Sequence, residues 1–173
     1  MHLTVQEIQS FRSFPVETRY SFSKRCFNNE LLAYLRLRPL QGHQVPEFIG
    51  HWTASFPDRE LPGDRTCDVI ILEVLEACRL DKFPISEIGV KQRQNIRTQI
   101  LDTATYVHSK NIFFPQLSLS NFMILKNNHI PRMVGFSSTF DPQIYSLTDE
   151  EKNLHKKFAL LRLQFELDDL GYV

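Results

Sequence analysis

Residues with the types and spacing that catalysis or metal binding demands are scarce in this chain. The run Gly135-Phe-Ser-Ser-Thr139 places a serine after a glycine, but it lacks the closing glycine of the G-x-S-x-G nucleophile turn. The histidines show no H-E-x-x-H pattern, and the three cysteines, Cys26, Cys67 and Cys78, show no paired spacing. Zinc ligands are usually arranged in such patterns. We therefore expect no nucleophile elbow, no metal site and no cofactor.

The composition is that of an ordinary globular chain. Basic and acidic residues number 20 each, so the formal net charge is zero. A neutral chain lacks the field that holds nucleic acid or an anionic membrane. No run approaches the roughly 18 apolar residues of a membrane helix, and residues 1–7 do not resemble a signal peptide. Unpaired cysteine spacing favours reduced thiols, so we expect a cytoplasmic or nuclear protein.

The first half of the chain predicts one helix and a hairpin. Residues 1–24 have no clear period, and we expect a poorly ordered lead there. Apolar residues recur at helical spacing from Ser23 to about Leu37. Two strand candidates, 47–55 and 66–74, flank a polar stretch over 57–64 that suits a hairpin loop, and the second has a β-branched apolar centre. A short strand in the lead could use Leu3, Val5 and Ile8.

The second half predicts a long helix, a small hairpin and a closing helix. The long helix spans about 86–109, and its buried face is expected to hold Ile96, Ile100, Ala104 and Val107. Short strands over 122–125 and 131–134 are joined through the turn pair Asn127-Asn128. His108 is expected to be a core or boundary histidine. Segregated helices and antiparallel strands predict the α+β class.

The closing helix has the clearest end signals. Thr148 and Glu151 form a capping box, and Gly171 follows the expected end. Asp168 and Asp169 crowd the helix end that prefers cations, so either the helix stops earlier or these acids face a positive partner. Lys156, Lys157 and Arg162 form a solvated face or part of a partner surface. Four large apolar residues share one side: Leu154, Phe158, Leu161 and Phe165.

The ordered series of local sequences resembles the core of a protein kinase. Residues 106–113 are similar to the end of the long C-lobe helix, and residues 114–121 to the catalytic loop. Residues 133–137 resemble the strand entering the Asp-Phe-Gly motif. Residues 70–76 resemble the strand that runs into the hinge. Residues 27–34 resemble the αC region of a divergent kinase-like group common in filamentous fungi.

This resemblance implies a truncated protein-kinase-like fold for the whole chain, 1–173, as a single domain. A small antiparallel N-lobe sheet with one helix would occupy residues 25–76. A reduced, mostly helical C-lobe would occupy residues 77–173. The similarity itself covers roughly residues 25–140.

The resemblance also implies that the catalytic groups are gone. Gln116 stands where a kinase has its catalytic Asp, and Gly135 stands where it has its metal-binding Asp. The six glycines form no G-x-G, and no strand lysine precedes Glu30, the αC candidate. Asn121, Glu30 and Glu73 would remain as remnants of the nucleotide cleft. Without its lysine, Glu30 is expected to be solvated, and the Asn121 amide is expected to fix its own loop.

We therefore expect a non-catalytic, pseudokinase-like binding or regulatory module. Its partner would be another protein, and nucleotide binding would be weak or absent. Two alternatives stay open. One is an atypical ATP-dependent phosphotransferase in which Asp141 or Asp149 replaces the lost acids. The other is a truncated remnant without selected activity.

Overall fold

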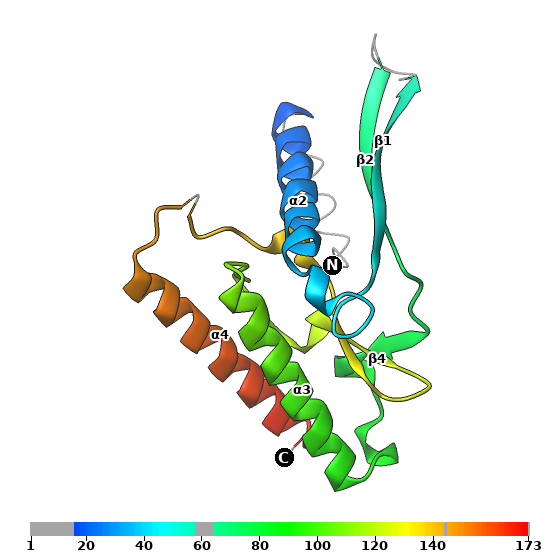
Figure 1. Ribbon diagram of the computed structural model, residues 1–173, viewed down its shortest axis with the longest axis vertical. Helices are drawn as coiled ribbons and strands as arrows, with labels where there is room; N and C mark the ends of the chain where they lie inside the picture. Colours follow the sequence, from blue (N-terminus) through cyan, green and yellow to red (C-terminus); the bar gives the residue numbers. More distant parts are fainter. Residues whose placement is uncertain (1–15, 58–63, 144, 173) are drawn as a thin grey trace.

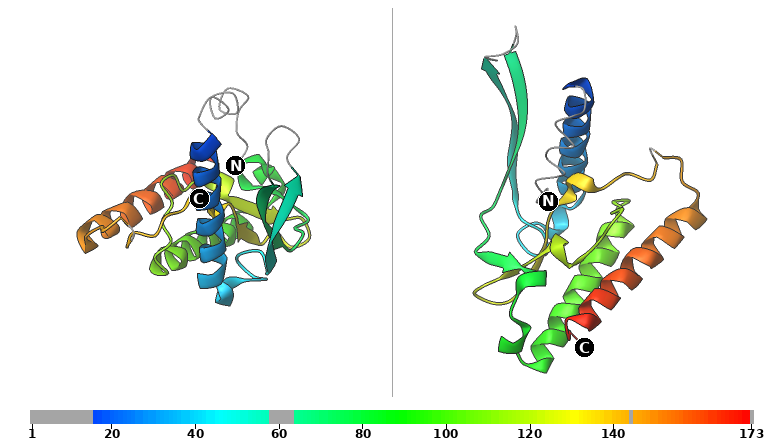
Figure 2. Two further views of the ribbon diagram at one scale, coloured as in Figure 1. Left: turned by 90° about the horizontal axis from the view of Figure 1, so that it is seen from above. Right: turned by 180° about the vertical axis from the view of Figure 1, so that it is seen from behind.

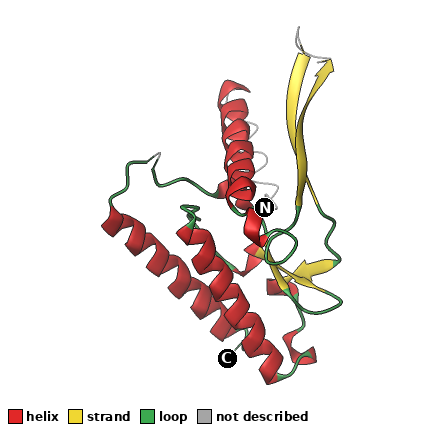
Figure 3. Ribbon diagram, viewed as in Figure 1, coloured by secondary structure: helices red, strands yellow, loops and turns green. Residues whose placement is uncertain are grey.

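The computed structural model describes residues 16–57, 64–143 and 145–172. These residues form three α-helices and two small antiparallel sheets, so the α+β prediction is confirmed. Helices α3 and α4 lie side by side, and a β-hairpin stands beside α2 (Figures 1 and 3). The bounds are α2 Val16–Arg36, β1 Phe48–Pro57, β2 Asp64–Leu72, β3 Ala77–Arg79, α3 Val90–Ser109, β4 Phe122–Leu125, β5 Pro131–Met133 and α4 Asp149–Asp169.

Helix α2 is longer than the sequence predicted. It begins at Val16 rather than Ser23, so the assignment of residues 16–24 to a poorly ordered lead is wrong. Residues 21–23 are exposed, and exposed turns carry no apolar stripe from which a helix can be recognised. Residues 1–15, with the short strand suggested there, lie outside the described residues.

Strands β1 and β2 form the predicted hairpin, which pairs with no other strand of the described chain. One face packs toward α2: Lys24 Nζ lies 2.7 Å from Asp68 Oδ2. The opposite face carries Trp52 directly across from Val69, and both side chains are exposed. The hairpin therefore has one face held by a helix and one apolar face in solvent.

The second sheet has the order β3-β4-β5. Its β4–β5 hairpin confirms the predicted strand pair and the turn at Asn127-Asn128. Strand β3 was missed, because a segment of three residues has too few positions to show alternation. Met133 is the last residue of β5. Its backbone N–H donates to the Gln44 carbonyl at 2.8 Å, and this hydrogen bond connects the sheet to the chain that follows α2.

Helix α3 begins at Val90, later than the predicted Ser86, because residues 85–87 form a separate 3-10 turn. Its predicted buried face is confirmed, and His108 is buried beside it. Helices α3 and α4 run alongside each other in every view (Figures 1 and 2). Arg97 of α3 contacts Asp168 of α4 at 2.5 Å, so the acid at this helix end does face a cation, within the same chain. None of the described helices is long and apolar enough to cross a bilayer.

Helix α4 has an apolar stripe on each of two opposite sides. Leu163 and Leu167 are fully buried against the rest of the molecule. The four residues predicted to share a side do so, but that side is exposed. Its exposed fractions are 52% for Leu154, 62% for Phe158, 41% for Leu161 and 72% for Phe165. We call these four residues the outer stripe. The predicted capping box of Thr148 and Glu151 is present.

Candidate functional site

The loop that leads into β4 is held together by Asn121. The Ser118 backbone N–H donates to Asn121 Oδ1 at 3.2 Å, and Asn121 Nδ2 donates to the Val134 carbonyl at 3.4 Å. The backbones of Asn121 and Val134 are also joined, by a 2.7 Å hydrogen bond from the Val134 N–H. Both ends of the amide therefore bond to backbone atoms, as expected for a side chain that fixes its own loop.

Gly135 lies directly beside this amide. Its φ of 78° is in the left-handed region, and a Cβ added there would lie 3.4 Å from Asn121 Nδ2. The structure thus brings together two of the positions singled out from the sequence. One carries a neutral amide and the other carries no side chain, so neither supplies the charge that would hold a cation.

Glu30 approaches the same region from α2. It is half-buried rather than solvated, which corrects the prediction. Burial raises the pKa of its carboxyl, and a hydrogen bond from the Phe136 backbone N–H acts in the opposite direction. Phe136 begins the 3-10 turn η5, Phe136–Ser138, and its ring packs edge-on against Tyr34 at 5.4 Å between centroids. The Phe136 backbone N–H, next to Gly135, is therefore a hydrogen-bond donor to this carboxyl.

The other two sequence candidates do not join this group. Gln116 is exposed and makes no side-chain hydrogen bond within the described chain. Glu73 instead links the end of β2 to its neighbours. Its Oε2 accepts from the Glu47 backbone N–H at 3.0 Å, and its Oε1 lies 3.7 Å from Arg132 Nη1. Arg132 also donates to the Val45 carbonyl at 3.1 Å. Glu73 thus has a structural use in joining the hairpin to β5.

The acids proposed as replacements are engaged elsewhere. Asp141 is buried and lies 2.6 Å from Arg36 Nη2. Asp149 is the exposed first residue of α4 and lies 3.0 Å from Lys152 Nζ. Over the described ranges, no set of three His, Cys, Asp or Glu side chains is arranged to hold a metal ion.

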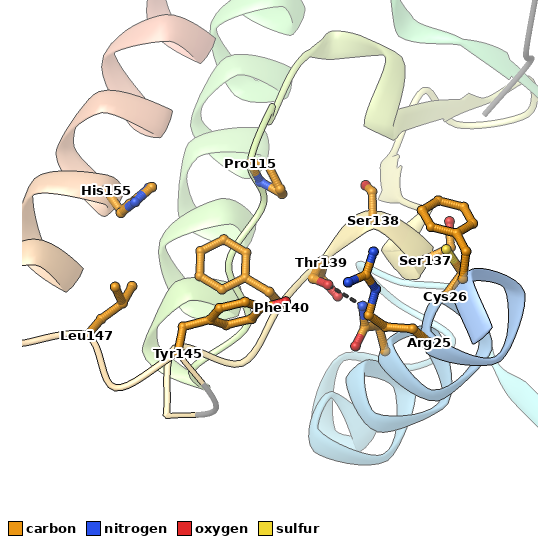
Figure 4. Close-up of a pocket in the computed structure, with 12 residues that line it drawn as sticks. Arg25, Cys26, Pro115, Ser137, Ser138, Thr139, Phe140, Tyr145, Leu147 and His155 are labelled. Atoms are coloured by element: carbon orange, nitrogen blue, oxygen red, sulfur yellow. Dashed lines mark hydrogen bonds between the residues drawn. The ribbon is translucent and has the colours of Figure 1, made fainter. Parts of the chain in front are cut away.

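A cleft that sequence reasoning missed lies between α2 and α4 (Figure 4). Its volume is about 460 Å³, which falls in the usual range for small-molecule sites. Arg25 and Cys26 lie on its α2 side, and His155 lies on its α4 side (Figure 4). Phe140 and Tyr145 lie between them. No spacing rule could have found these residues, because four separate segments of the chain contribute them.

No family model matches the chain, and no curated protein matches it either.

Proposed function

We propose that this chain is a non-catalytic, kinase-like binding or regulatory module that acts on another protein through the outer stripe of α4. The observation that carries the proposal is the placement of Asn121, whose amide bonds only to loop backbone and faces a glycine. A site for phosphoryl transfer needs carboxylates and magnesium at such a place to neutralise phosphate charge.

The kinase resemblance gains support from two contacts. Glu30 of α2, the αC candidate, approaches Phe136, the residue that corresponds to the Phe of Asp-Phe-Gly. Asn121 lies beside Gly135, as the loop Asn and the metal-binding position would in a kinase. Under this proposal residues 25–76 are the N-lobe remnant and residues 77–173 the C-lobe remnant.

The outer stripe supports a protein partner. A helix with one apolar side needs one packing neighbour, whereas α4 has two apolar sides and contacts the rest of the described chain through only one. Large contiguous apolar surface marks interaction sites. Lys157 is exposed near the middle of the helix, and Glu150 and Asp169 are exposed toward its ends. This pattern fits an amphipathic helix with basic residues at both ends and an acid near its centre.

A thermal shift experiment tests the loss of catalysis. Melting is measured with ATP alone and with ATP plus Mg²⁺, because a ligand that binds the folded state raises stability by RT ln(1 + [L]/Kd). We expect no shift in either condition at millimolar nucleotide. A magnesium-dependent shift together with transfer of labelled phosphate by the wild-type protein would overturn the proposal. An Asp141→Asn variant would then show whether that acid takes part.

Site-specific crosslinking tests the protein partner. A photoreactive amino acid is placed at Phe158, within the outer stripe, or at exposed Asn153 as the matched control. In an extract of its native cells, we expect an adduct with one protein from position 158 only. Phe165→Gln should abolish that adduct. No adduct, or an adduct only with a second copy of this chain, would contradict the proposed partner.

A further inference from the structure

The cleft between α2 and α4 has an apolar interior and a polar rim. The rings of Phe22, Phe140 and Tyr145 line it, together with Pro115 and Leu147. Phe140 and Tyr145 meet edge to face, with 5.4 Å between ring centroids. Aromatic rings pack favourably in offset or edge-on arrangements. The interior is therefore suited to a flat aromatic group.

The described side chains around the cleft include a basic group on each of two walls. Arg25 lies on the rim and makes no ion pair within the described chain; its guanidinium carbon is 5.5 Å from the centre of the Phe22 ring. His155 lies on the opposite wall, with its ring edge-on to Phe140 at 5.8 Å. Among the residues that the structure describes, no Asp or Glu side chain lines the cleft. An anionic group is therefore the charged group that this rim would accept.

The remaining polar groups divide into two kinds. Asn29 donates to the Thr139 carbonyl, and Thr139 Oγ1 donates to the Phe136 carbonyl, so both serve the fold. The hydroxyls of Ser137 and Ser138 make no hydrogen bond to the described residues. They lie on the same side of the cleft as Arg25 and Cys26 (Figure 4). These hydroxyls can donate to a carboxylate that also contacts Arg25.

We propose that this cleft binds a small aromatic carboxylate. The ring would pack among Phe22, Phe140 and Tyr145, and the carboxylate would lie between Arg25 and the two serines. The cleft has no lining residue in common with the group around Asn121 or with the outer stripe. Ligand binding here can therefore fail or succeed independently of the proposed protein-binding function.

Cys26 provides a reporter inside the cleft. A Cys67→Ser, Cys78→Ser variant leaves Cys26 as the only thiol, and its alkylation rate by N-ethylmaleimide is measured with 2-naphthoate or 2-naphthamide. These two probes share the same rings and differ in charge. We expect 2-naphthoate to slow labelling about threefold more than 2-naphthamide at equal concentration, since an ion pair on an exposed rim adds only modestly to affinity. A Cys26→Ser, Cys78→Ser variant retains only exposed Cys67 on the hairpin and should show no protection.

An Arg25→Gln substitution tests the charge directly. It should remove the difference between the two probes, and Arg25→Lys should retain part of it. Each rate is divided by that of the same variant without probe, because Arg25 also affects the Cys26 thiol. If Arg25→Gln does not fold, raising salt from about 0.05 M to about 0.5 M should weaken protection by 2-naphthoate alone. Equal protection by the two probes, or none by either, would overturn the proposal.

Discussion

Arg36 and Asp141 form an ion pair that joins the end of α2 to the chain beyond η5. Arg36 Nη2 lies 2.6 Å from Asp141 Oδ2, and the same guanidinium donates to the Asn111 carbonyl at 3.2 Å. Asp141 is buried, while Arg36 is only partly so. The pair therefore connects three segments of the chain.

Removing the Arg36 guanidinium should lower the stability of the fold. Arg36→Met leaves the buried carboxylate of Asp141 without its cation, and we expect a loss of about 2–3 kcal/mol in the free energy of unfolding, toward the lower end for a partly exposed pair. Urea denaturation at pH 7 measures it. Arg38→Met is the matched control, because Arg38 is exposed and makes no ion pair within the described chain. Equal losses in the two variants would contradict the structural role of the pair.

The same pair predicts a stability loss in acid. Burial alone would raise the pKa of Asp141, but the Gln143 backbone N–H and the Arg36 guanidinium hold it below its ordinary value of 3.8. The carboxylate therefore contributes stability above pH 3.8 that is lost as the pH falls through the lower, folded-state pKa. Asp141→Asn should remove this part of the acid dependence. The measurement is denaturant unfolding at a series of pH values.

His108 should make stability depend on pH in a higher range than Asp141 does. Its burial, with the nearby charges of Lys156 and His155, lowers its pKa from 6.5 to about 4. Folding therefore opposes protonation, and stability should fall as the pH drops from 6.5 toward 4, by about 2–3 kcal/mol. His108→Leu should flatten this slope. An unchanged slope in the variant would place the titrating group elsewhere.

Truncating a side chain should cost much more stability on the buried side of α4 than on the outer stripe. Leu163→Ala removes buried methyl groups and should cost about 2–4 kcal/mol. Phe165→Ala lies two residues away on the outer stripe and should change stability by less than about 0.5 kcal/mol. Thermal and urea unfolding of the two variants make the comparison. A large loss from Phe165→Ala would show that the outer stripe is already covered within the chain.

Gly135 is required by its backbone conformation. Because its φ of 78° is left-handed, Gly135→Ala should cost about 1–2 kcal/mol, and Gly135→Asn should cost less. Gly89 is the control, since its φ is −70° and nothing lies within 4 Å of an added Cβ. Gly89→Ala should cost about 0.5–1 kcal/mol, less than Gly135→Ala, because its only penalty is that alanine is a poorer N-cap residue than glycine. Similar losses at the two glycines would remove the conformational explanation.

How far the sequence predicts this fold depends on which signals are local. The capping box at Thr148, the turn at Asn127-Asn128 and the buried face of α3 all rest on short-range chemistry, and all are confirmed. The start of α2 rests on no such signal. No local signal shows which side of α4 is buried either. The exposed outer stripe has four large apolar residues, whereas the buried side has Leu163 and Leu167.

The candidate site also has a part that the sequence predicts and a part that it does not. The proximity of Asn121 to Gly135 follows from a resemblance in sequence order, and the structure places them together. The burial of Glu30 depends on where the Phe136 backbone lies, which no local pattern encodes. The cleft around Arg25 and His155 arises only when α2 and α4 are placed on either side of residues 137–147.

The isolated β1–β2 hairpin has a consequence for handling the protein. Neither strand has a second neighbour in the described chain, and the face bearing Trp52 and Val69 is apolar and exposed. Unpaired strand edges are templates on which other chains add strands, and an apolar face favours such growth. Aggregation at high concentration should therefore start at this hairpin, and a lysine at Val69 should raise the solubility of the protein.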